Sequence, residues 1–321
     1  MKPPVDRSGD QDYTRRPMAV RAPLETQSTA LVRFDAERPK GLLGRLRGAM
    51  EKWTLQQGGK DLEARLARLV APQNEYGVDP FGLDLEFAKA ALAPALWLYK
   101  NWFRVETQGI EQVPAGRALL IANHSGQLPF DALMIGIAML VEAEPPRICR
   151  AMVEKWAPTL PFVAPFFARI GQVVGTPENA RRLLAAGETL MVFPEGTRGL
   201  NKTYDKKYQL QDFGLGFMRL ALEMQAPIVP VAVVGAEEQA PALWDFKAAA
   251  KMIGFPSLPV TATVLPVPLP VKYRLYFGAP MRFSGSADDE DAELERKVKE
   301  VKARVQAMLN RGVEQRKGIF F

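Results

Sequence analysis

The sequence predicts a layered α/β fold in which a central sheet is flanked by helices. Short apolar runs typical of strands alternate along the chain with segments of helical periodicity. The 321 residues are 47% hydrophobic and 24% charged, a composition that excludes disorder as the main state and provides for a sizeable core. No repeat period is present, which excludes fibrous and solenoid proteins. We expect one large domain with an N-terminal appendage.

Residues 1–80 are predicted to be a basic arm with amphipathic helices, and residues 81–321 the main domain. Residues 1–60 hold 12 Lys and Arg against 7 Asp and Glu, so five of the six net positive charges lie there. Residues 40–55 carry apolar side chains at helical spacing with cations on other faces, which predicts an interfacial helix that Gly58-Gly59 ends. An ordinary packed helix fits this pattern equally well. A second amphipathic segment follows at 61–70.

The following elements are predicted in order along the chain. Residues 85–103 form an apolar helix interrupted at Pro94, and its last turns mix aromatic residues with cations. That mixture suits a lipid headgroup layer, although a buried domain helix is the competing interpretation. Strands are expected at 118–122, 148–153, 170–174, 189–193, 228–234 and 271–277, helices between them at 131–141, 178–186 and 214–224, and a packed terminal helix at 287–309.

No segment predicts a membrane-spanning helix or an export signal. The longest uncharged stretch, 252–271, contains five prolines, which a spanning helix does not accommodate easily. The first twenty residues lack the apolar core of a signal peptide, and Cys149, the single cysteine, has no partner for an internal disulfide or a cysteine-based metal site. We expect a cytoplasmic protein that is peripheral on the cytoplasmic face of the membrane.

His124 is the only histidine, so chemistry that needs an imidazole base must use it. It lies at the end of the predicted strand 118–122, in the segment Asn-His-Ser-Gly-Gln-Leu-Pro-Phe-Asp that ends at Asp131. The chain has no Gly-x-Ser-x-Gly nucleophile motif and cannot form a metal site with two histidines. A lone histidine is more often structural than catalytic, so this residue alone decides little.

A second polar motif, Phe-Pro-Glu-Gly-Thr-Arg at residues 193–198, follows another apolar strand. A turn with an arginine and free backbone N–H groups at a strand end can bind phosphate. A turn with solvated charges is the alternative.

Together and in this order, the two motifs and the later Ile-Val-Pro-Val at 228–231 resemble the glycerolipid acyltransferase family, which includes the 1-acylglycerol-3-phosphate acyltransferases. The resemblance covers residues 85–285. It implies the mixed central sheet of a glycerol-3-phosphate acyltransferase-like fold. It also implies acyl transfer from acyl-CoA or acyl carrier protein to a free hydroxyl of a lysoglycerophospholipid, in phospholipid biosynthesis, with no resident cofactor or metal.

By this resemblance His124 and Asp131 are the catalytic pair. The substrate-binding residues that it implies are Glu195, Gly196, Thr197, Arg198 and, by position between the first two motifs, Lys155. A plain surface lysine is nearly as good an interpretation of Lys155. The family's second motif normally ends in arginine, which is absent here at 170–177, so phosphate contact falls to other cations.

One spacing departs from the family pattern. Six residues separate His124 from Asp131, where the family has four. A fully helical segment would separate the pair by about 10 Å of rise, too far for a hydrogen bond. Gly126 and Pro129 favour a loop with Pro129 in the first turn of the next helix, which could return Asp131 to the ring. Relatives that form neutral lipids also show variants of this motif with Gly and Pro inside it.

The sequence therefore leaves alternatives open for the acceptor and for the activity. The acceptor could be a mono- or diacylglycerol or another lysolipid. A different class of function, a non-catalytic lipid-binding protein at a membrane surface, is the other alternative. Retention of His124, Asp131, Glu195 and Arg198 together disfavours the non-catalytic protein, because a lipid-binding protein needs no base. Nucleic-acid binding has only the basic arm in its favour. The expected partners are the acyl donor, a lysophospholipid acceptor and an anionic membrane surface, while acyl-chain length, donor carrier and oligomeric state stay open.

Overall fold

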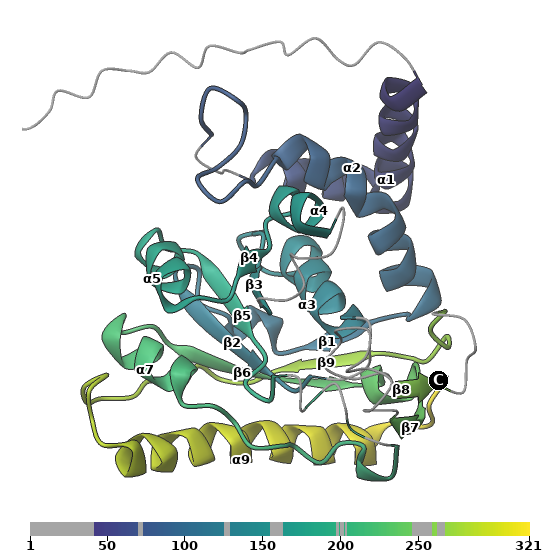
Figure 1. Cartoon of the computed structure of the whole chain (residues 1–321). Coiled ribbons are helices and arrows are strands. Elements are labelled where there is room, and N and C mark those ends of the chain that lie inside the picture. Colours follow the sequence, from purple (N-terminus) through teal and green to yellow (C-terminus); the bar gives the residue numbers. More distant parts are fainter. Residues whose placement is uncertain are drawn as a thin grey trace, which may run out of the picture. The chain divides into compact units, whose positions relative to one another are not determined.

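The computed structural model describes residues 42–69, 73–124, 129–154, 163–196, 199, 202, 204–245, 259–261 and 267–321. Gly41–Phe321 form one compact unit, and the described residues all belong to it (Figure 1). Residues 1–41 of the predicted basic arm lie outside the described residues, and the domain boundary near residue 80 stays a prediction.

A seven-stranded mixed sheet forms the centre of this unit, in the order β1-β9-β6-β2-β5-β3-β4 (Figure 1). The strands from β6 to β4 run parallel to one another, whereas β9 is antiparallel to β6 and parallel to β1. The predicted mixed sheet is thereby confirmed. The strands are β1 Glu106–Gln108, β2 Ala118–Ala122, β3 Arg150–Val153, β4 Val173–Val174, β5 Thr189–Val192, β6 Ile228–Val234 and β9 Arg274–Phe277.

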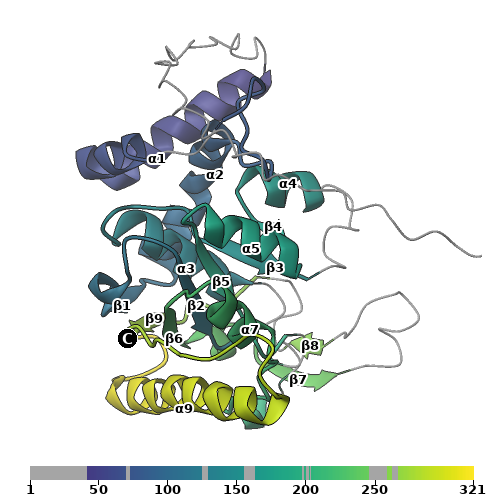
Figure 2. The same cartoon turned by 90° about the vertical axis from the view of Figure 1, so that its left-hand side faces the viewer.

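Helices cover both faces of the sheet, and Figure 2 shows α1 and α9 on opposite sides of it. Buried side chains of α1, α2 and α3 pack on one face, and those of α5, α7 and α9 pack on the other. The helices are α1 Leu42–Ala67, α2 Leu85–Trp97, α3 Phe130–Val141, α4 Val163–Arg169, α5 Pro177–Ala185, α7 Gly216–Glu223 and α9 Asp291–Gln315.

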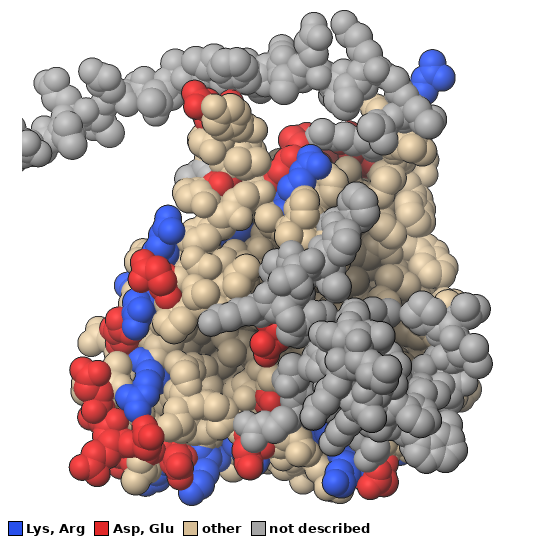
Figure 3. Space-filling view, in the orientation of Figure 1, with Lys and Arg blue, Asp and Glu red and all other residues tan. Residues whose placement is uncertain are grey.

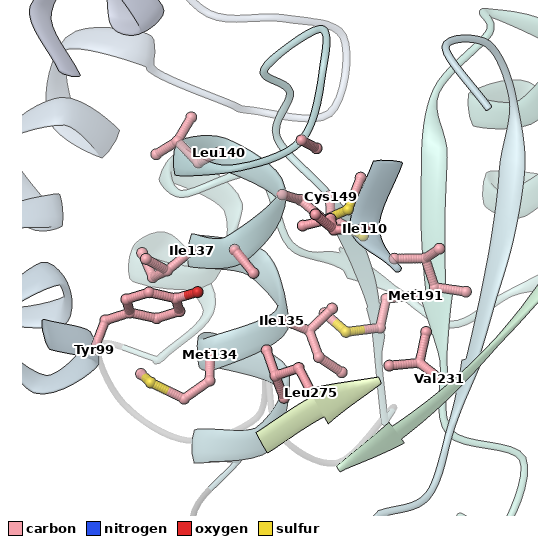
Figure 4. Close-up of a cluster of buried hydrophobic side chains, with 14 of the residues drawn as sticks. Tyr99, Ile110, Met134, Ile135, Ile137, Leu140, Cys149, Met191, Val231 and Leu275 are labelled. Carbon is pink, nitrogen blue, oxygen red and sulfur yellow. The ribbon is translucent and has the colours of Figure 1, made fainter. Parts of the chain in front are cut away.

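The neighbouring strands β2 and β6 have side chains buried on both faces of the sheet, which explains why their sequences are continuous apolar runs. In β2, Leu120 and Ala122 belong to the cluster around α3, while Leu119 and Ile121 belong to the cluster around α9. Figure 4 shows the side chain of Ile135 of α3 pointing toward the strands, beside Met191 and Leu275. Because this layer is apolar on both sides, polar groups are expected where the strands end.

Two predicted helix breaks are wrong. α1 continues through Gly58-Gly59 to Ala67, so the two amphipathic segments are one helix. The side chain of Leu62 occupies the space where a Cβ at position 58 would lie, so the glycine makes room for packing and does not end the helix. α2 likewise continues past Pro94 and passes into a π-helical turn at Leu98–Trp102, where the N–H of Phe103 bonds to the carbonyl of Leu98 at 2.8 Å.

Three short strands were not predicted from the sequence. β1 is a polar edge strand, and β7 Ala242–Asp245 pairs antiparallel with β8 Pro259–Thr261 in a separate two-stranded sheet. Within the described ranges, no helix is both long enough and apolar enough to cross a bilayer.

Charged side chains of both signs line the left and lower edges of the face in Figure 3, over α5, α7 and one end of α9. Ion pairs such as Arg181 with Glu223 and Arg219 with Asp291 account for this surface. Because positive and negative groups alternate there, this side does not form a basic patch.

Candidate active site

His124 and Asp131 form a hydrogen bond at the end of β2. His124 lies two residues beyond that strand, and Asp131 lies in the first turn of α3. Nδ1 of His124 is 2.8 Å from Oδ2 of Asp131. Of the six residues between them, 125–128 lie outside the described residues. The bond between the two side chains shows that the longer spacing still returns the carboxylate to the ring.

Asp131 is held through both of its carboxylate oxygens. Asp131 is fully buried, and its Oδ1 accepts the backbone N–H of Ala132 at 2.8 Å. The first turn of a helix also favours a negative charge. When Nδ1 of a neutral imidazole donates to this carboxylate, the lone pair of Nε2 is free to accept a proton. The side chain of His124 is 13% exposed, so a small group can reach it.

The ring of Phe193 stacks on the imidazole of His124, with centroids 4.2 Å apart and an angle of 26° between the planes. Phe193 directly follows β5, which pairs in parallel with β2. The carboxyl ends of parallel neighbours meet at one edge of the sheet, and this brings the two motifs together. The stacking and the hydrogen bond to Asp131 together restrict rotation of the imidazole ring.

Asn123 ties the residue before the histidine to the neighbouring strand. Its Nδ2 donates to the carbonyl of Val233 at 3.1 Å, and its Oδ1 accepts the N–H of Val233 at 2.7 Å. The side chain is fully buried. Asn123 thus extends the pairing of β2 with β6 beyond Ala122 and Val231, the last residues that pair through their backbones. This fixes the direction of the backbone that leads into His124.

Glu195 holds the backbone of His124. Its Oε1 accepts the His124 N–H at 3.0 Å, and its Oε2 accepts the N–H of Gln211 at 2.7 Å. The Nζ of Lys202 lies 3.4 Å from the same Oε2. Glu195 is only 1% exposed, so its carboxylate is occupied by groups of the protein.

Two glycines make the turn after β5 compact. Gly196 adopts φ of +56°, and its N–H bonds to the carbonyl of Phe193 at 3.0 Å. Gly199 packs so closely that a Cβ there would lie 2.9 Å from the Cβ of Glu195 and 3.1 Å from the Cβ of His124. Position 199 therefore accommodates only hydrogen at the centre of the site.

The sequence of this chain is similar to known proteins. The family model described as Acyltransferase matches residues 104–234, which include both motifs. An uncharacterized protein of Mycobacterium leprae is 41% identical over 261 residues, covering 77% of this chain and 71% of that protein. This chain belongs to the acyltransferase family.

Two further acyltransferases are similar to it. A protein of Mycoplasma pneumoniae named probable 1-acyl-sn-glycerol-3-phosphate acyltransferase is 26% identical over 178 residues, covering 53% of this chain and 64% of its own. The crystal structure of the 1-acyl-sn-glycerophosphate (LPA) acyltransferase PlsC from Thermotoga maritima aligns with a TM-score of 0.48 at 15% identity, over 85% of this chain and 98% of that one.

Among the site residues predicted for this acyltransferase, the structure brings together His124, Asp131, Glu195 and Gly196. Thr197, Arg198 and Lys155 lie outside the described residues, so their predicted phosphate contacts stay predictions. In the described part of the chain, no three His, Cys, Asp or Glu side chains gather closely enough to hold a metal ion.

Sequence reasoning missed several groups around the histidine. Phe193 and Gly199 stand inside or beside the second motif, but stacking and close approach are tertiary features without a sequence signal of their own. Lys202 and Gln211 lie in the polar segment after that motif, where nothing in the pattern distinguishes them. Asn123 was part of the quoted first motif, and a polar residue at the end of a buried strand is the signal that points to it.

Proposed function

We propose that this acyltransferase moves a fatty acyl group from acyl-CoA, or from acyl carrier protein, to the free hydroxyl of 1-acylglycerol-3-phosphate, forming phosphatidic acid. The observation that carries the proposal is the hydrogen bond between His124 and the buried Asp131, which leaves Nε2 of the only histidine able to accept a proton. The name of the Mycoplasma pneumoniae relative supports this acceptor.

In the proposed reaction, His124 acts as the general base. Nε2 takes the proton of the acceptor hydroxyl while the hydroxyl oxygen attacks the thioester carbonyl carbon. The tetrahedral intermediate collapses, its C–S bond breaks, and the leaving thiolate takes the proton from Nε2. The products are the ester and the free thiol carrier. Asp131 stabilises the imidazolium that forms between these steps, as the aspartate does in a hydrolase triad, and the substrate supplies the nucleophile.

Cations near the second motif are proposed to bind the phosphate of the acceptor. Arg198 follows Gly196 by two residues, and Lys155 follows β3 by two residues, so both belong to segments that leave the carboxyl edge of the parallel strands. An arginine can engage a phosphate with two parallel hydrogen bonds. Glu195 is proposed to position His124 and not the acceptor, because its carboxylate is already bonded within the protein.

The enzyme is further proposed to work at the membrane surface, where its lipid substrates are. Large apolar side chains of α1 are exposed, namely Leu46, Trp53 and Leu55, while Leu62 and Leu66 of the same helix are buried. A helix that exposes large apolar side chains beside cations such as Lys52 is suited to lie at the headgroup layer.

The test is acyl transfer by the purified protein from a long-chain acyl-CoA to lysophosphatidic acid, with monoacylglycerol as a parallel acceptor. Wild type should acylate lysophosphatidic acid, and His124→Ala should lose at least about a hundredfold in kcat, the scale of a lost general base. Transfer to monoacylglycerol alone would overturn the phosphate-bearing acceptor. Absence of transfer to either acceptor, also with acyl carrier protein as donor, would favour a lipid-binding protein.

A further inference from the structure

Lys202 lies in a buried cluster directly behind the site, between two acidic side chains. Its Nζ is 2.9 Å from Oε1 of Glu237 and 3.4 Å from Oε2 of Glu195. The side chains of Lys202, Glu195 and Glu237 are 4%, 0% and 5% exposed. Ion pairs at a surface contribute little, but charges this deeply buried interact strongly because water does not screen them.

The same two carboxylates also bind the backbone of the loop at residues 204–211. Oε2 of Glu237 accepts the N–H of Tyr208 at 2.8 Å, and Oε2 of Glu195 accepts the N–H of Gln211 at 2.7 Å. Lys202 therefore lies between the two points at which this loop is attached. Each acid serves both the lysine and the loop, so displacement of one partner disturbs the other.

Tyr208 shows how firmly this loop is held. Its φ is +61°, in the left-handed region that a tyrosine rarely adopts. Its hydroxyl donates to Oε2 of Glu238 at 2.9 Å and accepts the N–H of Gly235 at 2.9 Å, and its carbonyl accepts Nε2 of Gln306 at 2.8 Å. A backbone in this conformation persists only where its surroundings determine it from several sides.

The charge balance of the cluster depends on Lys202. Burial raises the pKa of Glu237, and the ammonium of Lys202 opposes that shift. Without the lysine, two buried carboxylates would face each other without a cation between them. They would then separate, take up a proton or admit water, and in each case the Nζ contact that holds Oε2 of Glu195 in place is lost.

We propose that Lys202 is a positioning residue for acyl transfer, because it fixes the Glu195 carboxylate that in turn holds the backbone of His124. The chain of contacts runs from Lys202 Nζ to Glu195 Oε2, and from Glu195 Oε1 to the His124 N–H. In this inference Lys202 affects the position of His124 and does not contact the substrate. The expected effect on kcat rests on the proposed function. A shift of about 1 Å in a reacting group can cost about a hundredfold in rate, so a small movement of His124 is enough.

The single histidine makes this inference measurable without activity. Protein labelled with ¹⁵N-histidine and freed of any histidine tag gives one backbone amide signal, that of His124. Hydrogen exchange of this amide reports on its bond to Glu195. The variants are Lys202→Met and the conservative Lys202→Arg, and the matched control is Lys206→Met, an exposed lysine of the same loop.

Lys202→Met should speed hydrogen exchange of the His124 amide at least about tenfold. It should also lower kcat with lysophosphatidic acid by about tenfold or more, with little change in the KM for acyl-CoA or for lysophosphatidic acid. Lys202→Arg should recover most of both losses, and Lys206→Met should match wild type. Should Lys202→Met fail to fold, Lys202→Met/Glu237→Gln restores the net charge of the cluster while still lacking the contact to Glu195, and it should show the same fast exchange.

Slow exchange of the His124 amide in Lys202→Met, equal to the Lys206→Met control, would overturn the positioning role whatever the activity. An unchanged kcat with fast exchange would overturn its catalytic consequence. If wild type transfers no acyl group to any acceptor, the proposed function fails, and the exchange measurement still decides whether Lys202 holds His124.

Discussion

Asn123 continues the pairing of two strands with its side chain, through two hydrogen bonds to the backbone of Val233, and the catalytic candidate His124 is the next residue. Strand pairing and the position of the base are therefore one structural feature. Removal of the amide leaves the N–H and the carbonyl of Val233 without these partners in the interior.

We expect Asn123→Ala to lower the free energy of unfolding by about 1–3 kcal/mol, the cost of buried polar groups that lose their partners. It should also lower kcat, because the backbone before His124 is no longer fixed. Urea unfolding followed by circular dichroism measures the first effect. Asn101→Ala, at an exposed position after α2, serves as control and should stay within about 0.5 kcal/mol of wild type.

We expect Gly199→Ala to inactivate the enzyme with little loss of secondary structure. The added methyl group would press on the Cβ atoms of Glu195 and His124, both of which belong to the rigid centre of the site. Steady-state kinetics and the circular dichroism spectrum check the two parts. Gly116→Ala is the control, since a Cβ at position 116 has no atom within 4 Å, and activity equal in the two variants would contradict the close packing.

We expect the buried ion pair of Arg150 with Asp79 to be needed for folding stability. The two side chains are 1% and 2% exposed, and Nη2 of Arg150 lies 2.5 Å from Oδ2 of Asp79. Arg150→Met leaves a buried carboxylate unpaired and should cost about 3–5 kcal/mol in the free energy of unfolding. Arg68→Met, which removes an exposed partner of Glu144, should cost less than about 1 kcal/mol. Similar losses in the two variants would refute the distinction.

We expect Cys149 to resist thiol reagents in the native state. Burial raises the pKa of its thiol from 9.0 to about 12, and only the thiolate reacts. At pH 8 the native protein should react with a disulfide reagent at least about a thousandfold more slowly than the urea-unfolded chain, as three pKa units imply. The folded thiol holds its proton more tightly, so the stability it contributes is present below pH 9 and is lost as the pH rises toward 12. Fast native labelling at pH 8 would be the contrary outcome.

We expect binding to anionic vesicles that weakens with salt, because residues 1–60 carry most of the net positive charge. Trp53→Ser should weaken binding to phosphatidylserine vesicles in co-sedimentation, since Trp53 is an exposed aromatic residue of α1. Tyr76→Ser is the control for loss of an exposed aromatic residue outside the helices. Binding that is the same for wild type and Trp53→Ser would remove α1 from the membrane contact.

The sequence predicted those parts of the fold that have a local cause. β2 and β6 were predicted at their observed residues, because a strand buried on both faces is an unbroken apolar run between polar ends. β1 was missed because its residues, Glu-Thr-Gln, form an exposed edge strand without an apolar pattern. Gly58-Gly59 misled the helix prediction, since packing of Leu62 over Gly58 outweighs the low helix propensity of glycine.

The candidate site shows the same division. His124 and Asp131 could be paired from the motif, and a loop ahead of Pro129 was sufficient to expect their hydrogen bond across the longer spacing. The contact of Lys202 with Glu237 could not be predicted, because these residues lie 35 positions apart and meet only when the loop at 204–211 folds against the sheet. A buried ion pair leaves no periodic pattern in either segment.

The antiparallel strand β9 has a consequence for the order in which the molecule assembles. β1 is an edge strand whose neighbour is β9, so the polypeptide from Glu106 onward must wait for Arg274–Phe277 before this edge of the sheet is closed. During translation the early strands leave the ribosome long before that partner exists. The residues around His124 are therefore all synthesised before the sheet that positions them is complete. A nascent chain that stops before β9 lacks two strands' pairing at this edge, because β1 has no partner there.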